Sequence, residues 1–226
     1  FLSKEGYLKK ITAQSLRMSG EQKFKEGDSL LFSRETSNRA DLLVFTDQFQ
    51  CYKSRLSEFE DGKASQLGDY LPQKLGMEQG ESVISVVLTQ DYSGFVLFFF
   101  ENGKVAKVPL NAYETKTNRK KLTGAYCDKS PLVSVYALQA DEQMAVYSSD
   151  GRALIFSTAQ LLPKTTRNTQ GVAVLTLKKK AVLKDVQLLA DSGITNESRY
   201  RTKTIPSAGS LLKDEDASEK QQTFDV

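Results

Sequence analysis

A short pattern that recurs four times constrains this chain more than any other feature. Each copy places a turn residue before a short segment that contains basic residues, and the turn residues are Gly6, Phe49, Gly103 and Gly151. The copies follow one another after 43, 54 and 48 residues. Three of the four turns hold glycine, which adopts positive φ angles without steric cost, so each copy predicts a β-hairpin.

Further strands are predicted around these hairpins. Short apolar runs bounded by turn residues are typical of strands that are buried on both faces. Such runs lead into three of the hairpins at residues 42–45, 95–100 and 144–147, and other runs cover residues 83–88 and 132–138. No stretch longer than about two helical turns has a convincing helical period. The chain is therefore predicted to be all-β.

The length of the repeat predicts how the strands are arranged. A sheet built from one repeat is too small to bury its faces alone, and repeats of about 40 to 50 residues are typical of propeller blades. We therefore predict an all-β, propeller-like disc of four-stranded blades. It has about four blades, or four and a partial fifth after Gly171. A plain β-sandwich with chance similarity among its hairpins is the competing architecture.

The composition excludes several kinds of chemistry. The 226 residues include no histidine and two cysteines, so a Ser-His-Asp or Cys-His triad cannot form and a zinc site would have two thiolates at most. The sequence also has no phosphate-binding glycine loop and no metal-ligand spacing. We expect a domain with no catalytic residue, no metal site and no cofactor of its own. An enzyme is the weakest of the three function classes considered.

Features of membrane insertion and export are missing from the sequence. The longest apolar run, residues 95–100, is too short to cross a bilayer. The first residues lack the charged-then-apolar pattern of a signal peptide. Cys51 and Cys127 have no framework spacing, which indicates reduced core thiols. We therefore expect a cytoplasmic protein with no membrane partner.

Charge is unevenly distributed along the chain. Residues 206–226 hold two basic and five acidic residues, a net charge of −3, so the rest of the chain carries +6. The final segment is predicted to be a flexible acidic tail, and the folded domain is predicted to span residues 1–205. The folded part is therefore the basic part.

Basic residues recur just after the hairpin turns. Equivalent blades would present them at a repeating position, which favours a track for the phosphate backbone of duplex DNA without base recognition. Nearby loops add to this track. The stretch from residue 164 to residue 203 holds nine basic and three acidic residues. The candidate DNA-binding residues are Lys9, Lys10, Lys53, Arg55, Lys104, Lys107, Arg119, Lys120, Lys121, Arg152, Arg167, Lys178, Lys179 and Lys180. The competing function is a propeller that docks a protein partner and binds no nucleic acid.

Four sequence segments resemble a known family. They are residues 4–10 (Lys-Glu-Gly-Tyr-Leu-Lys-Lys), 43–47 (Leu-Val-Phe-Thr-Asp), 63–72 and 167–172. Their order and spacing over about residues 3 to 189 resemble repeats in the C-terminal domain of bacterial type IIA topoisomerase A subunits, namely those of DNA gyrase and topoisomerase IV.

The resemblance implies a fold, a function and partners. It implies a β-pinwheel, in which neighbouring blades exchange strands, with duplex DNA bent around a basic outer rim. In this family the catalytic tyrosine belongs to a separate breakage-reunion core, so none of the tyrosines here is nominated as a nucleophile. The implied partners are duplex DNA, that core and the ATPase subunit. ATP and Mg would act on other domains of the parent enzyme, in the bacterial cytoplasm near the nucleoid.

The sequence departs from the gyrase pattern in two places. It has no run resembling the Gln-Arg-Arg-Gly-Gly-Arg-Gly box that supports strong chiral wrapping in gyrase, and Phe49 replaces the turn glycine of the second repeat. A topoisomerase IV-like domain that wraps DNA weakly is therefore the favoured interpretation.

Overall fold

The computed structural model describes residues 1–115 and 120–216. The chain forms two compact units: unit 1 contains Phe1–Tyr92 and Thr115–Ala125, and unit 2 contains Ser93–Glu114 and the residues from Tyr126 onward. Within the described residues, each unit holds two four-stranded antiparallel sheets, which we call blades 1 to 4 in chain order. The predicted all-β class and propeller-like blades are confirmed.

Unit 1 contains blades 1 and 2. Blade 1 has the strand order β3-β1-β2-β6, formed by β1 (Leu2–Ser3), β2 (Tyr7–Leu8), β3 (Leu30–Phe32) and β6 (Asp69–Tyr70). Blade 2 has the order β10-β5-β4-β7, formed by β4 (Asp41–Thr46), β5 (Gln50–Arg55), β7 (Val83–Thr89) and β10 (Lys121–Thr123). Short helices join the strands: α1 (Ala13–Arg17), α2 (Leu71–Leu75) and the 3-10 turn η1 (Leu56–Glu58).

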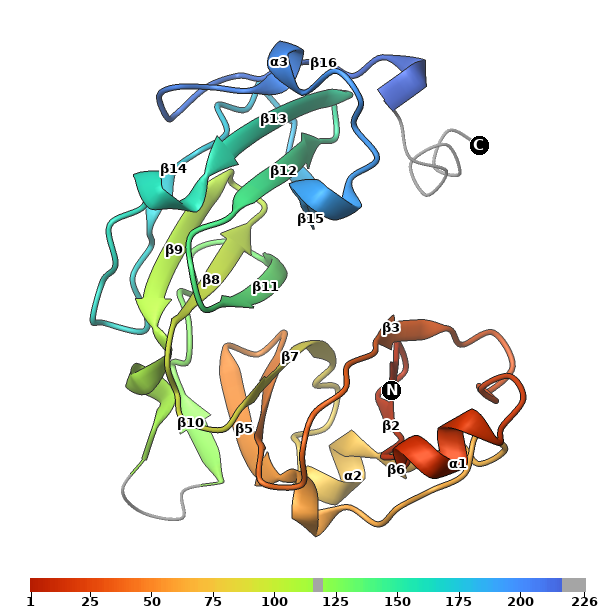
Figure 1. Ribbon diagram of the computed structural model, residues 1–226. Helices are drawn as coiled ribbons and strands as arrows, with labels where there is room; N and C mark the ends of the chain where they lie inside the picture. Colours follow the sequence, from red (N-terminus) through yellow and green to blue (C-terminus); the bar gives the residue numbers. More distant parts are fainter. Residues whose placement is uncertain (116–119, 217–226) are drawn as a thin grey trace. The chain divides into compact units, whose positions relative to one another are not determined.

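Unit 2 contains blades 3 and 4, whose strands are labelled in Figure 1. Blade 3 has the order β11-β8-β9-β14, formed by β8 (Phe95–Phe100), β9 (Lys104–Pro109), β11 (Leu132–Leu138) and β14 (Val172–Ala173). Blade 4 has the order β15-β12-β13-β16, formed by β12 (Gln143–Ser148), β13 (Arg152–Ser157), β15 (Leu183–Leu188) and β16 (Ser210–Leu211). The helical turns are α3 (Glu197–Tyr200), η2 (Leu110–Tyr113), η3 (Thr158–Gln160), η4 (Leu189–Asp191) and η5 (Asp214–Asp216).

The four predicted hairpin turns have the same backbone conformation. Gly6, Gly103 and Gly151 have φ angles of +90°, +76° and +76°, and Phe49 adopts a φ of +59° at the equivalent place. The left-handed conformation costs a residue with a side chain about 1 to 2 kcal/mol, so Phe49 is held there by the hairpin around it. The structure thus confirms that the four copies are equivalent, including the copy without glycine.

Outer strands are exchanged between blades. β6 follows the β4–β5 hairpin in the chain but pairs with β2 of blade 1. In the same way, β10 follows the β8–β9 hairpin but pairs with β5, and β14 follows the β12–β13 hairpin but pairs with β9. This exchange is the pinwheel arrangement. In blade 4, the corresponding strand is β16, which the C-terminal segment supplies.

The residues after Gly171 complete blades 3 and 4. β14 pairs with β9, β15 pairs with β12, and β16 pairs with β13, so the segment that could have begun a partial fifth blade is used in existing sheets. The sequence predicts a flexible tail from residue 206 onward. Residues 206–216 pack instead, because β16 has backbone partners on β13 and Asp216 is buried. Residues 217–226 of the expected tail lie outside the described residues.

Each unit has a hydrophobic core that both of its blades share. In unit 1, Leu2 and Leu8 of blade 1 pack with Leu42, Val44 and Tyr52 of blade 2. In unit 2, residues of blade 3 pack with residues of blade 4, namely Leu97, Phe99 and Val105 with Met144, Val146, Leu154 and Phe156. Burying side chains of this kind stabilises each pair of blades by roughly 1.5 to 3 kcal/mol per residue. The aromatic residues of β8 are thus core residues, as the sequence predicted.

Candidate nucleic-acid interface

Three of the predicted DNA-binding lysines share one structural position. Lys10, Lys53 and Lys107 each lie four residues after their hairpin turn. The Lys10 Nζ donates to the Leu56 carbonyl in η1, at 3.3 Å. The Lys107 Nζ donates to the Thr158 carbonyl in η3, at 3.1 Å, and the Lys53 Nζ donates to the Thr115 Oγ1 just past η2, at 3.0 Å. Each lysine therefore links its own hairpin to the segment that comes directly after the next hairpin in the sequence.

Lys107 is nearly buried, and its ammonium group makes all of its described contacts within the fold. Its side chain is 5% exposed, and its Nζ lies 2.6 Å from the Asp141 Oδ1 and 4.7 Å from the centre of the Phe95 ring. Hydrogen bonds from Lys107 and from the Thr158 hydroxyl hold the pKa of Asp141 below its usual range. The Lys107 ammonium thus has an anion within the fold, which leaves no open side for a DNA phosphate.

We expect Lys107→Ala to destabilise the protein by about 2 kcal/mol. The change removes a nearly buried ion pair and leaves a cavity where the side chain packed. The measurement is urea unfolding followed by circular dichroism. Lys104→Ala is the control, because Lys104 lies on the same strand and is only half-buried. Equal losses in the two variants would contradict the role given to Lys107.

Lys9 is also a structural residue. Its side chain is buried, and its Nζ donates to the carbonyls of Lys23, at 2.8 Å, and Ala64, at 3.1 Å. Burial lowers the pKa of Lys9. Both carbonyls lie in loops of unit 1, so Lys9 fixes those loops rather than reaching a ligand.

The other residues predicted on hairpin strands are more accessible but mostly engaged. The Lys104 Nζ donates to the Gln170 Oε1, at 3.2 Å, and an Arg152 Nη donates to the Gly209 carbonyl, at 3.1 Å. Lys121 is paired with Glu78. Arg55, with a side chain 72% exposed, lies 3.7 Å from Asp41. Lys120 is exposed, and Arg119 lies outside the described residues.

Five basic residues lie on two connectors of unit 2, and four of them are exposed. We define the outer-edge connectors as residues 162–171, which precede β14, and residues 196–209, which precede β16. In the first connector, the Lys164 amide donates a hydrogen bond to the Lys107 carbonyl, at 2.8 Å. In the second, the Thr202 amide donates to the Ile155 carbonyl, at 2.9 Å. Lys107 and Ile155 are equivalent in the repeat, so the two connectors run along the same edge of successive blades.

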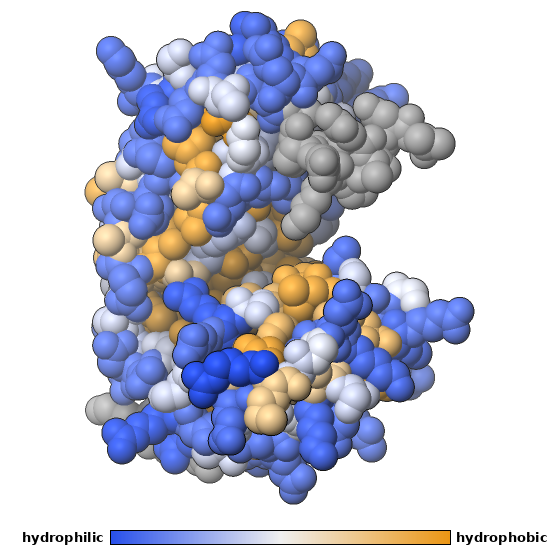
Figure 2. Space-filling model, turned by 45° about the vertical axis from the view of Figure 1, so that its right-hand side comes forward, coloured by the Kyte–Doolittle hydropathy of each residue, from blue (hydrophilic) through white to orange (hydrophobic). Residues whose placement is uncertain are grey.

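Charge distinguishes these connectors from their counterpart in blade 1. Residues 162–171 carry Lys164 and Arg167 with no acidic residue, and residues 196–209 carry three basic residues and one acidic residue. The corresponding residues 60–68 of blade 1 carry two acidic residues and one basic residue. Among the connectors that the structure describes in full, the basic ones therefore belong to unit 2. Hydrophilic residues cover most of this unit in the face shown in Figure 2.

A basic turn in unit 2 holds Lys178, Lys179 and Lys180, all of them exposed. The turn lies beside the β12–β13 hairpin, because the Ser149 amide donates to the Val182 carbonyl at 2.9 Å. The equivalent loops before β3, β7 and β11 are neutral or acidic: residues 23–28 hold two basic and two acidic residues, residues 76–81 two acidic, and residues 127–130 one of each. Among these four loops, the net basic charge therefore belongs to blade 4 alone.

Some accessible residues were not among the predicted contacts. Lys164, Lys184, Arg199, Arg201 and Lys203 contribute to the positive charge between residues 164 and 203, but the hairpin pattern does not point to them. The signal that could have found them is their position in the connectors and next to the basic turn. Arg167, which was selected, is half-buried, with its guanidinium 5.9 Å from the Tyr113 ring centre.

Residues 1–115 and 120–216 hold no group of three or more Cys, Asp or Glu side chains placed to bind a metal ion. Among the helices of the same residues, none has the length and apolarity needed to span a membrane.

Comparisons with known proteins place the fold in a class. The crystal structure of the C-terminal domain of DNA topoisomerase IV matches with a TM-score of 0.72 and 24% identity, over 85% of this chain and 61% of that chain. The E. coli ParC C-terminal domain matches with a TM-score of 0.68 and 14% identity, over 94% and 92% of the two chains. These likenesses establish a propeller-like fold of the pinwheel type.

Sequence comparisons agree with the likeness between the folds. The family model for the DNA gyrase C-terminal domain, beta-propeller, matches residues 147–189. The A subunit of DNA topoisomerase 4 from Staphylococcus aureus is 26% identical over 182 residues, which make up 78% of this chain and 23% of that protein. The resemblance inferred from the motifs is confirmed: the chain is similar to the C-terminal domains of type IIA topoisomerase A subunits. It spans only about a quarter of the length of that relative.

Proposed function

We propose that this domain is non-catalytic and holds duplex DNA on the basic surface of unit 2. One observation carries the proposal: nine basic residues lie on the two outer-edge connectors, the basic turn and the start of β15. These residues are Lys164, Arg167, Lys178, Lys179, Lys180, Lys184, Arg199, Arg201 and Lys203. All except Arg167 are exposed. The similarity to C-terminal domains of topoisomerase A subunits supports the same function.

Contacts of this kind explain what the domain can do with DNA. Lysine and arginine bind phosphates without reading bases and release counterions, so binding is sequence-independent and falls steeply with salt. Two successive edges would contact one duplex at separate points. Bending it by 40 to 90° over 20–30 bp costs on the order of 1 to 6 kcal/mol, which several such contacts offset. The domain would thereby present a curved duplex to the rest of the enzyme.

The proposal extends to the parent protein. The domain would act with the breakage-reunion core of its own subunit and with the ATPase subunit, which use Mg and ATP. The domain itself needs no cofactor, and its location is the bacterial cytoplasm. The missing gyrase box favours weak, topoisomerase IV-like wrapping.

A salt titration of binding to a random duplex of about 30 bp tests the function. If six or more phosphates are contacted, affinity should fall by roughly a thousandfold or more between about 50 and 200 mM salt. Fluorescence anisotropy gives the dissociation constants. The rival function, a propeller that docks a protein, predicts no duplex binding at low salt. Affinity that is unchanged across this range would also exclude the proposed phosphate contacts. Relaxation of supercoiled DNA by the isolated chain would contradict its non-catalytic role.

A further inference from the structure

The two faces of blade 4 have different neighbours. Side chains alternate along a strand, so Met144 and Val146 of β12 face the core shared with blade 3, and Ala145 and Tyr147 face the other way. The second face also includes Ala153 and Ile155 of β13. Residues of the C-terminal part of the chain cover it, namely Leu189, Ile194, Tyr200 and Leu212. We call residues 189–216 the cap.

The repeat shows what the cap replaces. Aligned on the hairpin turns, Ala145, Tyr147 and Ala153 of blade 4 correspond to Leu97, Phe99 and Val105 of blade 3. In blade 3, this face packs against blade 4. The same face of blade 1, with Leu2 and Leu8, packs against blade 2. In blade 4 the cap therefore lies where a following blade would lie.

The side chains of blade 4 are adapted to the cap. Two of the three positions become alanine, so the face has shorter side chains where a thin cap, rather than a sheet, lies over it. The lysine that reaches toward the next blade in the other repeats becomes Ile155, which is fully buried. In the other repeats the acceptor lies just after the hairpin of the next blade. Blade 4 is followed by the cap rather than by a further hairpin in the described residues, so a lysine there would be a buried charge without that partner.

The cap also covers the free edge of β13. β16 pairs with the first half of that strand, at Arg152 and Ala153. The Thr202 amide donates to the Ile155 carbonyl in the second half, at 2.9 Å. Without the cap, the whole length of a hydrophobic edge strand would be open, which is the usual template for pairing with another chain.

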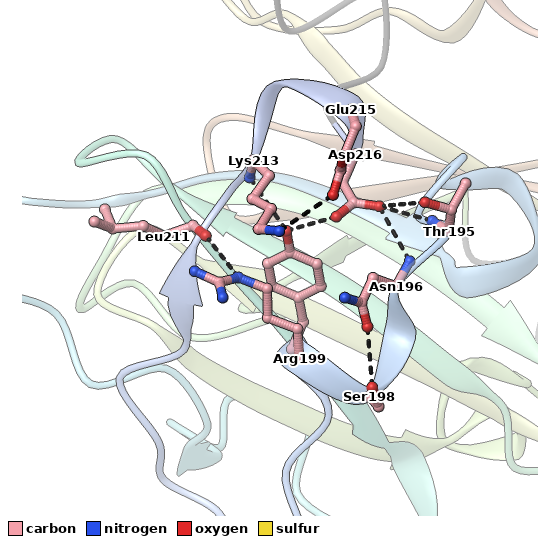
Figure 3. A network of polar contacts seen from close by, with 9 residues as sticks. Thr195, Asn196, Ser198, Arg199, Leu211, Lys213, Glu215 and Asp216 are labelled. Carbon is pink, nitrogen blue, oxygen red and sulfur yellow. Dashed lines mark hydrogen bonds and ion pairs between the residues drawn. The ribbon is translucent and has the colours of Figure 1, made fainter.

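One carboxylate fastens the end of the cap (Figure 3). Asp216 is 1% exposed and accepts hydrogen bonds from the Thr195 amide and hydroxyl, both at 2.8 Å, from the Asn196 amide at 3.1 Å and from the Tyr200 hydroxyl at 2.7 Å. Burial alone would raise the pKa of Asp216, but these hydrogen bonds outweigh it and hold the pKa far below its usual range. Asp216 thus ties the last described residues to α3.

We propose that the cap takes the place of a fifth blade and keeps the edge of β13 from pairing with blade 4 of a second copy of this chain. The partner is a second copy because the uncovered edge is self-complementary in an antiparallel pair. A cap of this kind is what a repeat array needs at its end. The inference does not depend on DNA binding.

Asp216→Ala in the full chain tests the cap. We expect hydrogen exchange at the amides of Thr195, Asn196 and residues 210–212 to rise by about tenfold or more. We also expect a concentration-dependent dimer in sedimentation velocity, whereas the unaltered chain stays monomeric. Asp214→Ala is the matched control, because Asp214 lies on the same turn and is exposed. A second variant that ends at residue 206 removes β16 outright and should dimerise more strongly.

Two outcomes would overturn the inference. The first is rapid exchange throughout the cap in a chain that remains monomeric, since the exposed edge would then attract no second copy. The second is unchanged exchange in Asp216→Ala, since Asp216 would then not fasten the cap. If the shortened chain does not fold, the result for Asp216→Ala alone decides whether the inference holds.

Discussion

Replacing Lys164, Lys179 and Lys203 together with glutamine is expected to lower duplex affinity by roughly a hundredfold at about 0.1 M salt. Each residue comes from a different basic segment of unit 2 and is exposed. If each contacts one phosphate, the slope of log affinity against log salt should become less steep by about 3. Fluorescence anisotropy with one duplex at several salt concentrations measures both quantities.

The matched control removes the same charge from unit 1. Lys4, Arg34 and Lys63 are exposed, and replacing all three with glutamine changes the net charge of the chain by the same amount. We expect this variant to lose much less affinity and to keep its salt slope. Equal effects in the two variants would show that total charge, rather than the basic surface of unit 2, governs binding. Changing Lys178, Lys179 and Lys180 to glutamate then tests the basic turn alone.

Gly171→Ala is expected to cost roughly 4 kcal/mol of stability. Gly171 precedes the exchanged strand β14 and has a φ of +69°, and a Cβ at this position would lie 2.1 Å from the Val105 carbonyl oxygen. The left-handed conformation contributes about 1 to 2 kcal/mol of the loss, and relieving the clash contributes about 1 to 3 kcal/mol. The clash is with backbone, so the strand must move away from β9. Urea unfolding measures the loss.

Gly151→Ala separates the two contributions. Gly151 has a similar φ of +76°, but a Cβ there would meet no described atom within 4 Å. This variant should lose only the conformational part, about 1 to 2 kcal/mol. A loss as large as that of Gly171→Ala would mean that close contact with β9 is not what requires glycine before the exchanged strand.

Local sequence signals predicted much of the fold. The hairpins depend on a turn residue with positive φ between short apolar strands, and both are visible in a window of about ten residues. Even Phe49 was aligned correctly, because the strands around it keep the pattern. The exchange of strands was implied only by the family resemblance. β6 and β14 are two residues long, and no local pattern reveals with which hairpin they pair.

The roles of the basic residues were harder to predict. Whether Lys107 is exposed depends on Asp141 and Thr158, which lie 34 and 51 residues further along the chain. The same holds for Lys9, which donates to the Ala64 carbonyl. Composition located the charge correctly between residues 164 and 203, but it could not separate accessible residues from those used to join blades. The packed end of the chain was missed because its acidic residues are typical of tails.

Strand exchange has a consequence for the order in which the protein can fold during synthesis. Blade 1 lacks its outer strand until residues 69–70 leave the ribosome, after the hairpin of blade 2 has been made. Blade 3 waits in the same way for residues 172–173, and blade 4 waits for residues 210–211 near the end of the chain. Until residues 210–211 are made, a growing chain therefore contains an incomplete sheet. Ribosomes that stall early would release chains with an open strand edge, which are the natural substrates of chaperones and proteases.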